Sequence, residues 1–107
     1  MILTGKAKED FLKYFRKRNK ISIFNSCENI FNKLDILYKT SLIIDFFDTK
    51  GIYISDWSCE IVDFRAEYDA SVSCGKKNYG IDGWHTTRQE AISKAIEKAN
   101  EIYNGKH

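Results

Sequence analysis

The chain has 107 residues, of which 43% are hydrophobic and 14% aromatic, and it contains no proline. A chain of this length forms one domain, so we expect a single domain over residues 1–107 with a substantial core. No apolar run approaches the ~18 residues of a membrane span, and the N-terminal stretch becomes charged too early for a signal peptide. Three cysteines without C-x-x-C spacing predict free thiols in a reducing, cytoplasmic setting.

The net charge is only +2, but the charges are unevenly distributed. Residues 6–20 hold seven basic and two acidic side chains, whereas residues 45–69 hold seven acidic and two basic ones. Such an asymmetry carries information about partners and association rather than about the fold.

The first expected element is a helix over about residues 6–19, with Thr4 placed to cap it. Its apolar residues recur at helical spacing and predict one buried side, formed by Ala7, Phe11, Tyr14 and Phe15. The opposite side is basic, with Lys6, Lys13, Arg16, Lys17 and Lys20. This basic side is either a plain solvated face or a ridge that contacts the phosphates of a nucleic acid.

A second helix is expected from a cap at Asn25 or Ser26 to about Tyr38. Its predicted inward residues are Ile30, Phe31, Leu34, Leu37 and Tyr38. Residues 41–49 fit either a buried strand or a short helix. The helical spacing of their apolar residues favours a helix, capped at Thr40 or Ser41 and ended by Gly51.

The C-terminal half predicts three strands, over 52–57, about 64–73 and 79–84, with a turn at 74–78 between the last two. A final helix begins at Thr87, where Glu90 completes a capping box, and runs to Tyr103 before a stop at Gly105. The predicted fold class is therefore α+β, with N-terminal helices, a small three-stranded antiparallel sheet, and a C-terminal helix packed on the sheet.

The sequence carries no catalytic motif. His85 is the only internal histidine, and we expect its side chain to cover the start of the last helix. The cysteines and histidine lack the paired spacing of a structural zinc site, and no glycine-rich phosphate loop is present. We therefore expect no enzyme activity, no cofactor and no metal site.

Two binding surfaces remain as hypotheses. The first is an acidic strand face for a basic protein partner, formed by Asp56, Asp63, Glu67 and Asp69. The second is a basic surface for nucleic-acid phosphates, formed by Lys13, Arg16, Lys17, Lys20, Lys76 and Lys77. The order helix, three strands, helix is that of double-stranded-RNA-binding domains. Those domains place a lysine cluster at the start of the last helix, where residues 86–90 hold only one basic side chain.

Two segments resemble those of short proteins of phages and mobile elements in low-GC bacteria. These proteins carry D-F-F-x-x-K-G-I-Y-I, matched by Asp45 to Ile54, and an ending similar to Y-G-I-D-G-W-x-x-T-R-x-E-A-I, matched from Tyr79 onward to Tyr103. The resemblance implies a small accessory protein that binds a macromolecule in a bacterial host cell, as anti-CRISPR proteins do. The implied partner is a CRISPR effector nuclease, together with its guide RNA, and neither a membrane nor a small-molecule substrate.

Overall fold

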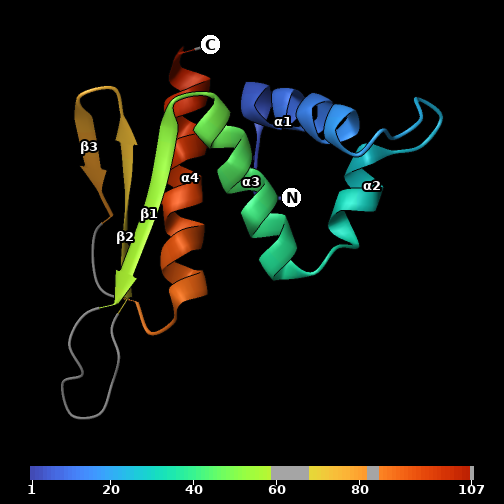
Figure 1. Cartoon of the computed structure of the whole chain (residues 1–107). Helices are drawn as coiled ribbons and strands as arrows, with labels where there is room; N and C mark the ends of the chain where they lie inside the picture. Colours follow the sequence, from blue (N-terminus) through green and yellow to red (C-terminus); the bar gives the residue numbers. More distant parts are fainter. Residues whose placement is uncertain (59–67, 82–84, 107) are drawn as a thin grey trace.

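The structure, a computed structural model, describes residues 1–58, 68–81 and 85–106. Within these residues, four helices and three strands follow in the order α1 (Gly5–Arg18), α2 (Cys27–Asn32), α3 (Ile36–Thr49), β1 (Ile52–Ser58), β2 (Tyr68–Cys74), β3 (Lys77–Gly80) and α4 (Arg88–Lys106). The predicted α+β class is confirmed, including the antiparallel sheet and the packing of the last helix on it (Figure 1). The predicted strand residues 64–67 and 82–84 lie outside the described residues.

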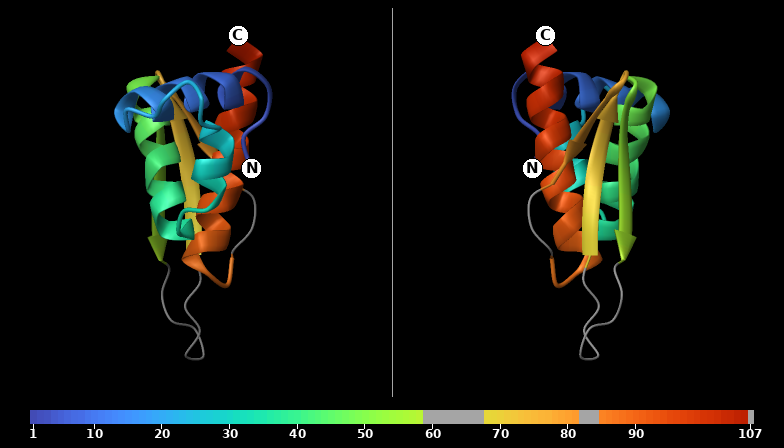
Figure 2. Two further views of the ribbon diagram at one scale, coloured as in Figure 1. Left: turned by 90° about the vertical axis from the view of Figure 1, so that its right-hand side faces the viewer. Right: turned by 90° about the vertical axis from the view of Figure 1, so that its left-hand side faces the viewer.

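The sheet has one face covered by helices. β1, β2 and β3 pair in sequence order, with Ile54 opposite Val72 and Val72 opposite Tyr79. Directly paired residues point to the same side of a sheet, and α3 and α4 pack on that side (Figure 2). Among the described residues, no helix covers the other side, which carries Tyr53 and Asp69.

An aromatic cluster joins the helices. α1 lies across the ends of α3 and α4 (Figure 1), and Phe46 of α3 sits where the three helices meet. The Phe46 ring centroid is 5.6 Å from that of Phe11, 5.3 Å from that of Phe47 and 5.8 Å from that of Tyr103. The predicted buried side of α1 is confirmed for Ala7, Phe11 and Phe15, while Tyr14 is half-buried against the core.

The predicted second helix is wrong in its extent, because two helices occupy this region. Ser26 caps α2 as one of the two expected candidates, its Oγ accepting a backbone N–H at 3.2 Å. Asp35 starts a new helix, since its Oδ2 accepts the Leu37 N–H at 3.2 Å. The resulting change of direction exposes three side chains that were expected to point inward, those of Ile30, Leu37 and Tyr38.

Residues 41–49 are helical, as preferred, but they form the C-terminal part of α3 rather than a separate helix capped at Thr40 or Ser41. The apolar residues that favoured a helix are all buried, namely Leu42, Ile43, Phe46 and Phe47. Gly51, which follows the C-cap residue Lys50, has a φ of 74°, and this confirms its expected role at the helix end.

Asparagines of α4 cap the start of α1. The Thr4 N–H donates to Asn100 Oδ1 at 2.9 Å, and the Ala7 N–H donates to Asn104 Oδ1 at 2.8 Å. Asn104 Nδ2 in turn donates to the Thr4 carbonyl at 3.0 Å, whereas the Thr4 side chain itself caps no N–H. The predicted stop at Gly105 is wrong, because α4 continues through it and thereby holds Asn104 in helical geometry.

We expect Asn104→Ala to lower the free energy of unfolding by about 1–3 kcal/mol, because it leaves the Ala7 N–H without its partner and removes one of the two hydrogen bonds to the Thr4 carbonyl, which keeps the one from the Lys8 N–H. Urea denaturation measures this change. The matched control is Glu101→Ala on the exposed side of α4, where a change within about 0.5 kcal/mol is expected. Equal effects of the two substitutions would contradict the capping role.

A tyrosine–carboxylate pair also fixes α4 to α1. The Tyr103 hydroxyl donates to Asp10 Oδ2 at 2.5 Å, and the Tyr103 side chain is buried. Burial, followed by the neighbouring Asp10 carboxylate, raises the pKa of Tyr103 to about 12. The hydrogen bond from Tyr103, and after it Lys6, holds the pKa of Asp10 below its usual value.

The raised pKa of Tyr103 predicts a loss of stability at alkaline pH. A tyrosine of an unfolded chain titrates near ~10, so the folded state keeps its proton over the range in which the unfolded state loses it. The stabilisation is therefore complete below about pH 10 and declines as the pH rises towards about 12. Urea denaturation at about pH 8 and about pH 11 should show a smaller decline for Tyr103→Phe than for the unchanged protein. Identical declines would contradict the assignment.

The cysteines fit the expectation of free thiols where the structure describes them. Cys27 is buried in the first turn of α2, and Cys74 is half-buried at the end of β2. Cys59 lies outside the described residues. In the part of the chain that the structure describes, no helix combines the length and the apolar character needed to cross a membrane.

Candidate nucleic-acid interface

Three of the four predicted contact residues on α1 and directly after it point into solvent. Lys13, Lys17 and Lys20 are exposed, and among the described residues none of them has an ion-pair partner. Lys6 and Lys8 differ, because their ammonium groups lie 3.2 Å and 2.9 Å from carboxylates. The unpaired lysines are thus the cations of this segment that remain available to an external anion.

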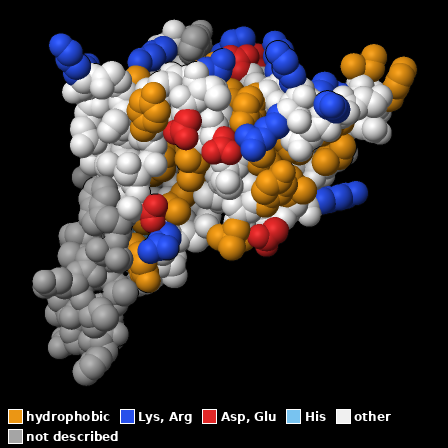
Figure 3. All heavy atoms as spheres, viewed as in Figure 1, with side chains coloured by type: hydrophobic (Ala, Val, Ile, Leu, Met, Phe, Trp, Pro, Cys, Tyr) orange, Lys and Arg blue, Asp and Glu red, His pale blue; other side chains and the backbone are white. Residues whose placement is uncertain are grey.

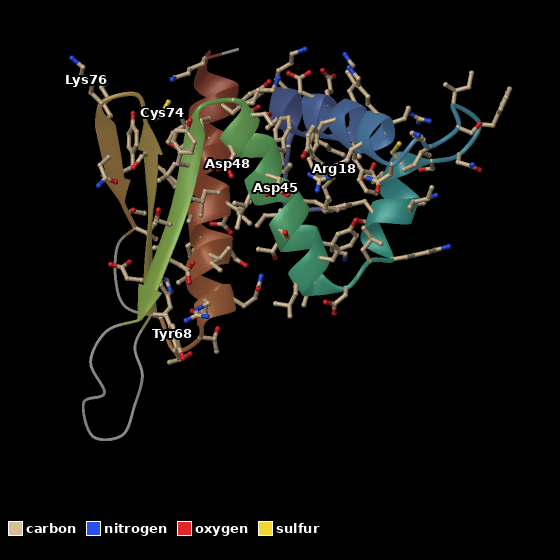
Figure 4. All side chains as sticks on the ribbon, in the orientation of Figure 1. Arg18, Asp45, Asp48, Tyr68, Cys74 and Lys76 are labelled. Carbon is tan, nitrogen blue, oxygen red and sulfur yellow. The ribbon has the colours of Figure 1, made fainter. Side chains whose placement is uncertain are left out.

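The fourth predicted contact residue, Arg16, is used inside the protein. Its guanidinium donates to three backbone carbonyls in residues 21–25 and so fixes the segment between α1 and α2. Arg18 is also engaged, with Nη1 lying 3.2 Å from Asp45 Oδ2 of α3 (Figure 4). The structure therefore brings Arg16 into contacts within the chain, which leave few of its N–H donors for an external phosphate.

A lysine directly after α3 lies beside the α1 lysines. A hollow between α1 and the C-terminal end of α3 is lined by Lys13, Lys17 and Lys50, with Asp10 as its one acid. Asp10 is held by Tyr103 and Lys6, and Glu9 is a further exposed acid on α1. We call Lys13, Lys17 and Lys50 the lysine surface; sequence reasoning missed Lys50 because only the tertiary fold brings it beside α1.

The two lysines of the β2–β3 turn lie at the same end of the molecule as α1 but on the far side of the α4 terminus (Figure 1). The turn is tighter than expected, because Lys77 already pairs with Cys74 as the first residue of β3. Gly75, with a φ of 62°, makes this two-residue connection possible. Lys76 projects away from the body of the protein (Figure 4), and lysine and arginine side chains follow this end towards α1 (Figure 3).

The predicted acidic strand face does not form among the residues that the structure describes. Asp56 pairs with Ala70 in the sheet, whereas Asp69 pairs with Trp57, so the two carboxylates lie on opposite faces. Asp56 is moreover bound to Arg88, with its Oδ2 3.0 Å from Nε. The other two predicted members, Asp63 and Glu67, lie outside the described residues.

The side chains at the start of α4 bind other residues of the chain. Arg88, its one basic residue, pairs with Asp56 and lies over the Tyr68 ring at 5.7 Å. The Thr87 cap is confirmed, since its Oγ1 accepts the Glu90 N–H at 3.1 Å. His85 is buried beside this first turn, as expected, with Nδ1 3.5 Å from Glu90 Oε1. This end of the helix therefore lacks the free cations with which double-stranded-RNA-binding domains contact phosphates.

Within residues 1–58, 68–81 and 85–106, no group of three or more histidine, cysteine or acidic side chains has the arrangement of a metal site. No protein-family model, curated protein or solved structure matches this chain.

Proposed function

We propose that this chain is a non-enzymatic binding protein that contacts the phosphates of RNA through the lysine surface. The observation that carries the proposal is the convergence of Lys13, Lys17 and Lys50 on one hollow, all exposed and without ion-pair partners among the described residues. An RNA strand would release condensed counterions on binding there, which supplies affinity but little choice of sequence.

The division of the acids between the two sheet faces favours this surface over the acidic strand face. A protein partner that recognised Asp56 would have to break its ion pair with Arg88, and it would still not reach Asp69 on the other face. The lysine surface requires no such rearrangement.

The resemblance to accessory proteins of phages extends the proposal to a partner. We propose that the RNA is the guide of a CRISPR effector nuclease in the bacterial cytoplasm, and that binding inhibits this nuclease. The α1 lysines would then hold the guide RNA while the remaining surface lies against the effector. The net charge of +2 fits inhibition by binding to a protein–RNA complex better than inhibition by mimicry of a nucleic acid, because such mimics are acidic.

A pull-down tests the partner. Tagged protein is incubated with lysate that contains a CRISPR effector and its guide RNA, with and without ribonuclease. We expect the effector and the guide to be recovered together and the recovery to fall sharply for Lys13→Glu/Lys17→Glu. Recovery of RNA without effector would retain the RNA-binding proposal and refute the nuclease partner, whereas recovery of neither would refute both.

A further inference from the structure

The segment between α1 and α2 presents two large apolar side chains to solvent. Phe24 is 91% exposed and Ile23 is 79% exposed, the two highest values among the large hydrophobic residues that the structure describes. Leaving a phenylalanine in water forgoes the roughly 1.5–3 kcal/mol that its burial would contribute. An aromatic ring in this position therefore calls for a reason outside the folding of the chain.

The backbone that carries Phe24 is fixed by hydrogen bonds. The Asn25 N–H donates to the Ser22 carbonyl at 3.0 Å, which closes a turn with Ile23 and Phe24 at its two central positions. The Phe24 N–H also donates to Ser22 Oγ at 3.2 Å. The aromatic side chain is thus held out by a closed turn, which lowers the entropy that would be lost when it contacts a partner.

Arg16 ties this turn to the basic helix. Its guanidinium donates to the carbonyls of Ser22 and Asn25, the two residues on either side of the exposed pair. The chain leaves α1 through Lys20 in the left-handed conformation, and the Ile21 N–H bonds back to the Arg16 carbonyl at 3.0 Å. Phe24 is therefore anchored to the end of the helix that carries the unpaired lysines.

We propose that Phe24 stacks on an unpaired base of a single-stranded RNA whose phosphates lie along the lysine surface. This inference rests on the proposed function and names the form of RNA that the surface takes. Lysines beside an exposed aromatic ring are the combination with which proteins bind single strands, because the cations follow the backbone and every base has a face to stack on. In a duplex the bases stack on one another and leave no free face for Phe24, so the contact with Phe24 selects single-stranded RNA.

The test is a cycle that removes the ring and the base separately. Fluorescence anisotropy is measured with a labelled twelve-residue oligouridine and with an oligonucleotide of equal length whose central positions are abasic, so that the phosphates are retained. We expect Phe24→Ala to weaken oligouridine binding by about tenfold, within the range found for one stacked base. The unchanged protein should lose a similar factor on the abasic strand, and Phe24→Ala should lose little more there. Phe24→Trp should restore binding.

The control is Tyr38→Ala, which removes another exposed aromatic residue, at the start of α3, and should leave binding unchanged. Equal binding of oligouridine by the unchanged protein and Phe24→Ala would overturn the stacking inference, and it would leave the proposed function standing if Lys13→Glu/Lys17→Glu still abolished binding. Absence of oligouridine binding by the unchanged protein would overturn both. Sedimentation with phosphatidylserine vesicles that depends on Phe24, without RNA binding, would overturn both in favour of a membrane partner.

Discussion

Phe46→Ala should lower the free energy of unfolding by about 3–5 kcal/mol, the range for truncation of a buried phenylalanine. Its side chain is fully buried, and its ring contacts those of Phe11 in α1, Phe47 in α3 and Tyr103 in α4. Removal of the ring opens a cavity between three helices that cannot all move inward together. Urea denaturation measures the loss. Phe46→Leu, which retains most of the volume, should cost about 1–1.5 kcal/mol.

Phe24→Ala is the matched control, because it is the same substitution at a residue that is 91% exposed. Its effect on unfolding should stay within about 0.5 kcal/mol. A loss for Phe46→Ala no larger than that for Phe24→Ala would contradict the position of Phe46 at the centre of the aromatic cluster. The same control establishes that any loss of RNA binding by Phe24→Ala is not caused by unfolding.

Lys13→Glu/Lys17→Glu should weaken RNA binding by about 100-fold at about 50 mM salt. Each substitution removes a phosphate contact and places a negative charge against the RNA backbone. Both side chains are exposed, so the melting temperature should change little. Fluorescence anisotropy with oligouridine measures the affinity.

The control for net charge is Lys33→Glu/Lys94→Glu, at exposed positions directly after α2 and within α4, away from the lysine surface. Both double variants change the net charge from +2 to −2, since each substitution contributes a change of −2. A specific surface predicts that the control retains most of the affinity. Equal losses in the two variants would show that only the overall charge matters and would remove the lysine surface from the proposal.

The sequence predicted the elements whose patterns are local. The spacing of Ala7, Phe11 and Phe15 defines α1, and Thr87 marks the cap of α4; the structure has both. The second helix was predicted wrongly because apolar residues continue at helical spacing through Leu37, although Asp35 interrupts the helix. From the sequence alone, an aspartate that caps a new helix cannot be distinguished from one on the solvent-exposed face of a continuous helix.

The candidate site was predictable only where it depends on a local pattern. Helical spacing places Lys13 and Lys17 on one exposed side, and this part of the basic ridge is present. The contacts of Arg16 within the chain could not be predicted, because its partners are carbonyls of a segment that folds back on the helix, which no periodicity reveals. Lys50 was missed because it comes close to Lys13 and Lys17 only when α3 packs beside α1. The acidic face depended on strand register, and the observed register separates Asp56 from Asp69.

The salt dependence of RNA binding tests the central claim most directly. For a single strand, the slope of log K against log salt concentration is about −0.7 for each phosphate neutralised, so contacts by Lys13, Lys17 and Lys50 predict a slope of about −2. Lys13→Gln/Lys17→Gln should reduce its magnitude to about 0.7 while the fold is retained. An unchanged slope in this variant, or affinity that does not depend on salt, would contradict an RNA interface at the lysine surface.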